Sequence, residues 1–233
     1  KERAVSWLRE RVFANRRPCE FNPRHYHIEQ VQNLTAEACF WWSQEDLMNY
    51  AVTFRDYRFA ENNLPVTLAL WDGGTNSVKA HSRWIRKTCE SGRAVMALDV
   101  SGAGVLQPHS FPESFDPLGF LGVVFKLADE LMWLNDSLPA MRTYDILRAL
   151  DMIDIWPGLQ SDDTRIYAHG NYGVYGQLAS LLDSRIVGVD SVDGIESYAE
   201  FVKSRYYDSD DIMSVIMPGI LNYLDLPDIE KWR

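Results

Sequence analysis

One stretch of the chain carries most of the information about its fold: Arg165-Ile-Tyr-Ala-His-Gly-Asn-Tyr-Gly-Val-Tyr-Gly176. Its first residues are mostly apolar and have the pattern of a buried strand, and Gly170 permits a sharp turn. The residues that follow have the spacing of a helix. A strand that passes through a glycine-rich turn directly into a helix predicts an α/β fold.

The same alternation continues on both sides of this stretch. Apolar runs with the length of buried strands occupy residues 66–71, 93–99 and 186–190. Segments with helical spacing occupy residues 80–91, 137–153 and 177–182. Strands that alternate with helices predict βαβ units, so we expect a three-layer α/β fold with a mostly parallel central sheet flanked by helices.

The first quarter of the chain has a different pattern. Residues 1–10 have the spacing of an amphipathic helix, and residues 26–58 contain two or three strand-like runs rich in aromatic and β-branched residues. We expect a single domain over residues 1–233, with a helix and antiparallel strands in 1–64 and the parallel sheet core in 65–233.

The composition excludes several kinds of partner. With 33 acidic and 23 basic residues, a net charge of −10, the chain offers no broad basic surface for nucleic acid. No run reaches the ~20 apolar residues of a membrane span. The three cysteines lie far apart, and no histidine cluster has metal-ligand spacing, so we expect no metal and no cofactor. The sequence leaves the cellular compartment open.

Taken together, these segments resemble the acetyl xylan esterase-like branch of the α/β-hydrolase superfamily. The residues that carry the resemblance are Leu70-Trp-Asp-Gly-Gly74, Val95-Met-Ala-Leu-Asp-Val-Ser-Gly-Ala-Gly104, Ser137-Leu-Pro-Ala-Met-Arg-Thr-Tyr-Asp-Ile-Leu-Arg-Ala-Leu-Asp151, the turn at Gly170, and Met217-Pro-Gly-Ile-Leu-Asn-Tyr-Leu-Asp-Leu-Pro-Asp228. The resemblance implies a carboxylic ester hydrolase that acts on a small acyl ester or an acetylated saccharide, secreted or periplasmic. It also implies further C-terminal strands carrying the acid and histidine of a catalytic triad, so we expect this chain to be truncated.

The family's nucleophile elbow reads Gly-Asn-Ser-Gly, and this chain has Gly170-Asn-Tyr-Gly173. The resemblance therefore places Tyr172 where the serine nucleophile belongs, with His169 as the nearest base in sequence. It places the oxyanion donors at the backbone amides of Gly74 and Gly173. A phenol with a pKa of about 10 is a poor nucleophile without a strong base beside it, and packing is the commoner role of such a tyrosine. We expect an esterase-like chain with weak or no activity, a pseudoenzyme.

The alternative is a non-catalytic domain that binds a saccharide or a protein in the former active-site crevice. Trp71, Asn171 and Asp190 are the candidate binding residues, since open α/β sheets place ligands at the carboxyl ends of their strands. A tryptophan face can stack on a sugar ring, although tryptophans more often fill the core. An uncovered edge strand would also favour oligomerisation.

Overall fold

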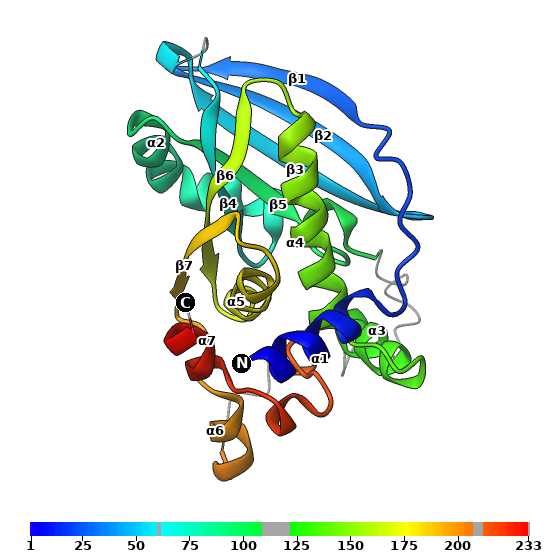
Figure 1. The fold of residues 1–233 in the computed structure, drawn as a ribbon. Helices are drawn as coiled ribbons and strands as arrows, with labels where there is room; N and C mark the ends of the chain where they lie inside the picture. The colour runs from blue at the N-terminus through cyan, green and yellow to red at the C-terminus, as the bar shows by residue number, and fades with distance from the viewer. Residues whose placement is uncertain (60–61, 109–121, 207–211, 233) are drawn as a thin grey trace.

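A computed structural model describes residues 1–59, 62–108, 122–206 and 212–232. Within these ranges, seven strands form one sheet in the order β1-β2-β3-β5-β4-β6-β7 (Figure 1). The strands are β1 (Arg24–Val31), β2 (Leu34–Gln44), β3 (Leu47–Asp56), β4 (Leu64–Leu70), β5 (Ala94–Asp99), β6 (Leu159–His169) and β7 (Ile186–Val192). The N-terminal strands and the core strands therefore share a single sheet.

The direction of the strands changes across this sheet. Strands β1, β2 and β3 pair in antiparallel fashion, and β3 pairs antiparallel with β5. Strands β5, β4, β6 and β7 run parallel. Their carboxyl ends lie along one edge, where the loops that follow β4, β5, β6 and β7 come together.

Helices cover both faces of the sheet. The α-helices are α1 (Glu2–Phe13), α2 (Ser82–Glu90), α3 (Gly122–Trp133), α4 (Leu138–Ile155), α5 (Tyr172–Leu182), α6 (Tyr198–Lys203) and α7 (Leu226–Trp232). Short 3-10 helices are η1 (Tyr57–Phe59), η2 (Gly74–His81), η3 (Gly104–Leu106), η4 (Ile212–Ser214) and η5 (Ile220–Asn222). In Figure 1, α2 lies on one side of the sheet and α1, α4 and α5 lie on the other. The three-layer α/β prediction is confirmed.

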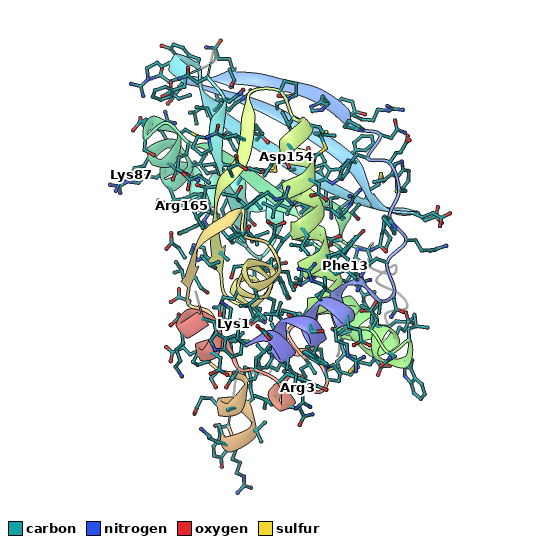
Figure 2. All side chains as sticks on the ribbon, viewed as in Figure 1. Lys1, Arg3, Phe13, Lys87, Asp154 and Arg165 are labelled. Carbon is teal, nitrogen blue, oxygen red and sulfur yellow. The ribbon has the colours of Figure 1, made fainter. Side chains whose placement is uncertain are left out.

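Alternation along the core strands explains the two helical layers. Leu68, Leu70, Met96 and Leu98 pack into the large core beneath α1, α4 and α5. Their neighbours Ala69, Trp71, Val95 and Ala97 point to the opposite face and pack with Ile85 and Cys89 of α2. Side chains fill the space between the sheet and both layers, and Lys87 of α2 points away from the sheet (Figure 2).

Helix α4 is the most deeply buried helix of the described part of the chain. Fourteen of its eighteen residues are buried, including Arg142 and Asp145. It begins at the cap Ser137, whose hydroxyl accepts a hydrogen bond from the Ala140 amide at 3.3 Å. Because both polar side chains lie inside the protein, they must find partners there, and those partners belong to the candidate site.

None of the helices in the described ranges has the length and apolar character needed to cross a membrane.

Candidate functional site

The candidate site is centred on the turn between β6 and α5. The strand ends at His169 and the helix begins at Tyr172, so only Gly170 and Asn171 form the connection. Gly170 has a φ of +56°, whereas Asn171 is already right-handed with a φ of −58°. The chain therefore reverses at Gly170.

This turn is fixed by its neighbours. The Gly170 amide donates to the Val192 carbonyl at the end of β7 at 2.8 Å, and the Gly170 carbonyl accepts from the Gly173 amide at 3.1 Å. The loop after β7 is also close, since a Cβ on Gly194 would lie 3.2 Å from the Gly170 oxygen. The position of the turn is therefore set by two adjacent parallel strands.

Tyr172 lies at the start of α5 and belongs to the core, with 6% of its surface exposed. Its ring contacts that of Tyr175 edge to face, with centroids 5.6 Å apart. The guanidinium carbon of Arg142 lies 5.4 Å from the centre of the Tyr172 ring. These contacts place Tyr172 in a packed aromatic and cationic cluster.

Arg142 joins three parts of the site. It is 1% exposed. Its Nε donates to the Ser101 carbonyl in the loop after β5 at 3.1 Å, and one terminal nitrogen donates to the Tyr175 hydroxyl at 2.8 Å. The Tyr175 hydroxyl in turn donates to the Ser214 carbonyl of η4 at 3.0 Å. A planar guanidinium suits this role because its donors point in several fixed directions.

Asp145 holds the same loop from one turn further along α4. Its Oδ2 accepts from the Ser101 amide at 2.7 Å, so α4 fixes both the amide and the carbonyl of Ser101. Burial raises the pKa of the Asp145 carboxyl, and the Ser101 hydrogen bond acts in the opposite direction.

Asp99 connects the loop after β4 to the loop after β5. Its Oδ1 accepts from the Thr75 amide at 2.6 Å, and its Oδ2 accepts from the Thr75 hydroxyl at 2.6 Å and the Val105 amide at 2.9 Å. Gly74 and Gly104 pack against this carboxylate so closely that a Cβ on either would lie within 2.2 Å of it. Both positions therefore require glycine.

The two amides expected to donate to an oxyanion have other acceptors in this structure. The Gly74 amide donates to the Trp71 carbonyl at 3.1 Å, and the Gly173 amide donates to the Gly170 carbonyl at 3.1 Å. Each closes a tight backbone turn. An oxyanion role for either amide would require its turn to open.

His169 lies in an aromatic cluster on the α2 side of the same edge. Its Nε2 lies 2.8 Å from the Tyr167 hydroxyl, and its ring centre is 5.1 Å from that of His81. Burial, followed by the effect of His169, lowers the pKa of His81 and favours its neutral form. His169 is thus hydrogen-bonded to a tyrosine two residues before it in the strand.

Trp71 is buried in the same cluster. It is 2% exposed, its indole N–H donates to the Gly74 carbonyl at 2.7 Å, and its ring stacks on His81 with centroids 3.8 Å apart. With this burial, Trp71 packs against the loop after β4 and presents no open face to a sugar.

The remaining candidates lie nearer to solvent. Asp190 is exposed on β7 and adds to the effect of burial in raising the pKa of Tyr167. The Asn171 amide group donates to the Ser214 hydroxyl at 3.5 Å. Asn171 also borders a cavity of about 400 Å³ whose other polar lining residues are Asp193, Glu196, Ser197 and Glu200. The structure thus brings Asn171, but not Trp71, to an open cavity.

Asp99, Arg142 and Asp145 are the residues that the sequence did not single out. Each had a local signal, because Asp99 ends an apolar strand and the other two interrupt a long apolar helix. Within the described ranges, no three His, Cys, Asp or Glu side chains gather in a way that could hold a metal ion.

No protein-family model and no curated protein matches the sequence. Solved structures do match. A candidate acetyl xylan esterase from Bacteroides fragilis has a TM-score of 0.78 and 13% identity, and the match covers 98% of this chain and 63% of that one. For acetyl xylan esterase 1 from Thermoanaerobacterium the TM-score is 0.64 at 14% identity, with 97% and 74% covered. For a glucuronoyl esterase from Solibacter usitatus the TM-score is 0.60 at 15% identity, and the match covers 86% of this chain and 61% of that one.

The chain thus spans less than two thirds of the length of the first of these structures and about three quarters of the second. At these identities the likeness concerns the arrangement of the backbone. It confirms the resemblance read from the sequence at the level of the fold: the chain has an α/β-hydrolase fold.

Proposed function

We propose that this chain is a carbohydrate-esterase-like α/β hydrolase whose nucleophilic serine is replaced, so that it hydrolyses acyl esters very weakly or not at all. One observation carries this proposal. The turn between β6 and α5, where this fold presents its nucleophile, contains Gly170 and Asn171 and is followed by the buried Tyr172, with no serine, threonine or cysteine.

The expected loss of rate is large. Removing the serine of a catalytic triad costs about 10⁶ in kcat, and what remains comes from substrate binding and oxyanion stabilisation. Tyr172 is a poor substitute, because its ring is packed in the core and a phenol is mostly protonated at neutral pH.

The test is hydrolysis of 4-nitrophenyl acetate and of acetylated xylan, measured for the unchanged chain and for Tyr172→Phe. We expect neither protein to exceed the background rate. Turnover by the unchanged chain that Tyr172→Phe abolishes would refute the proposal and identify Tyr172 as the reacting group.

A second candidate function is saccharide binding without turnover. The cavity of about 400 Å³ beside Asn171 favours it, because amide, hydroxyl and carboxylate groups can all hydrogen-bond to sugar hydroxyls. Calorimetric titration with acetylated xylo-oligosaccharides tests this function. Glu196→Ala should weaken saturable binding, and Glu90→Ala, on the α2 side of the sheet, should leave it unchanged. Absence of any heat of binding would remove this candidate.

A further inference from the structure

The turn after β6 contains one residue with a left-handed backbone, and it is not Tyr172. Gly170 has a φ of +56°, a region that other residues occupy only at a cost. Asn171 is right-handed, and Tyr172 is the first residue of α5 and has no positive φ. The nucleophile of an α/β hydrolase sits on the sharp, strained turn between strand and helix. In this chain that description fits Gly170.

The space around the turn supports the same assignment. Among the described residues, a Cβ built on Gly170 meets no other atom within 4 Å, so a side chain there would enter space that this part of the chain leaves open. A Cβ on Gly173 would lie 2.1 Å from the Ser191 hydroxyl, and Tyr172 is 6% exposed. Of these positions in the turn, Gly170 is the one at which a side chain would have free space in front of it.

The turn also has the rigidity that a nucleophile position needs. Hydrogen bonds to Val192 and from Gly173 hold both polar groups of the Gly170 backbone. A side chain at this position would project from a backbone that hydrogen bonds hold in place. Preorganised sites control the direction of attack in this way.

We propose that Gly170, and not Tyr172, occupies the nucleophile position of this chain, so that the position is vacant and open to solvent. The inference rests on the proposed function for its meaning, since only in a hydrolase-like site is this a nucleophile position. It changes which substitution restores a nucleophile: a hydroxyl or thiol introduced at Gly170 would face solvent, and one introduced at Tyr172 would face the core.

Cysteine substitution tests the assignment without requiring catalysis. Gly170→Cys, Tyr172→Cys and the control Gly219→Cys are treated with iodoacetamide, and each labelled peptide is followed by mass spectrometry. Gly219 is the matched control because it is exposed and left-handed, with a φ of +84°, and forms the N-terminal cap of η5. The natural Cys39 and Cys89 are buried, and burial raises the pKa of each to about 12, so they add little background. The third natural cysteine, Cys19, is half-buried, so the peptide that contains it is followed separately.

We expect the thiol of Gly170→Cys to be labelled as fast as that of the Gly219→Cys control. It should react about tenfold or more faster than the thiol of Tyr172→Cys, since a buried thiol reacts only when the structure opens. Circular dichroism establishes that each variant is folded. Slow labelling of Gly170→Cys, or labelling of Tyr172→Cys as fast as the control in a folded protein, would overturn the inference.

A crystal structure of the unchanged chain provides a second test, which does not depend on the folding of any variant. Tyr172 with a positive φ and its ring in solvent would overturn the inference, and a right-handed, buried Tyr172 supports it. Ester hydrolysis through Tyr172 would refute both proposals. Fast labelling of a folded Tyr172→Cys, with no hydrolysis by the unchanged chain, would overturn this inference and leave the proposed function standing.

Discussion

At the scale of single residues, two glycines with similar backbone torsions are expected to respond differently to alanine. Gly74 and Gly170 have φ values of +49° and +56°, so each alanine carries a strain of about 1–2 kcal/mol. At Gly74 the new Cβ would also lie 1.9 Å from Asp99 Oδ1, which adds about 1–3 kcal/mol of overpacking.

Thermal unfolding followed by circular dichroism measures the difference. For a chain of this size each kcal/mol lowers Tm by roughly 2–4 °C, so Gly74→Ala should unfold several degrees below Gly170→Ala. Equal Tm values for the two variants would contradict the close packing of Gly74 against Asp99.

The buried carboxyl of Asp145 predicts a pH dependence. Burial raises the pKa of the Asp145 carboxyl in the folded state above the unfolded value of about 3.9. Between these two pKa values the folded protein keeps a proton on Asp145 that the unfolded protein has released. The stability of the unchanged protein should therefore fall as the pH rises from about 4 towards the folded-state pKa. The side-chain amide of Asp145→Asn does not titrate, and its oxygen can still accept the hydrogen bond from the Ser101 amide.

Urea unfolding at pH 4.5 and pH 8 checks this prediction. Relative to the unchanged protein, Asp145→Asn should gain stability between the lower and the higher pH. A difference in unfolding free energy that stays constant across this range would show that Asp145 does not titrate there.

At the scale of elements, the cap of α4 supports several contacts of the site. The Ser137 hydroxyl satisfies the Ala140 amide, and the same helix carries Arg142 and Asp145. Ser137→Ala should destabilise the protein by about 1 kcal/mol, and Ser137→Thr, which keeps the hydroxyl, should cost much less. Chemical denaturation of the three proteins tests this, and an equal loss in both variants would rule out a capping role.

The strands and helices were largely predictable from the sequence, but the side-chain hydrogen bonds that join them were not. The apolar runs that became β4, β5, β6 and β7 and the glycine at the end of β6 are local signals, and so is the spacing of α4. Two of the partners of Arg142, the Ser101 carbonyl and the Tyr175 hydroxyl, lie 41 and 33 residues away in the chain. Such contacts follow from the topology and leave no trace in local spacing.

The turn itself shows the same limit. Motif spacing assigns Tyr172 to the family's serine, because Gly170-Asn-Tyr-Gly173 differs from the family's motif at that residue. The backbone begins a helix at that point and bends two residues earlier. Sequence spacing counts residues and cannot register where in a short connection the chain reverses.

At the scale of the whole molecule, the edge of the sheet formed by β7 predicts how two copies of the chain associate. Among the described strands, β7 pairs with β6 on one side only, and Val187 of β7 is 49% exposed. Unpaired strand edges favour association, so we expect this chain to form oligomers at high concentration. Val187→Lys should reduce them.

Size-exclusion chromatography with light scattering, over a range of concentrations, measures both proteins. An unchanged chain that stays monomeric throughout would contradict the prediction. Oligomers that persist equally in Val187→Lys would place the contact elsewhere.

The order of strands has a consequence for how the protein is made. In the antiparallel part of the sheet, β1, β2 and β3 each pair with the next strand in the chain. Strand β4 can pair with β6 only after β6 has been synthesised, because Leu64 pairs with Leu159, about 95 residues later. At a synthesis rate of ~5–20 residues per second, one side of β4 stays without its partner for about 5–20 s. During that interval a nascent chain would expose Leu68 and Leu70 without their partner strand, and it is then that a chaperone would have most to protect.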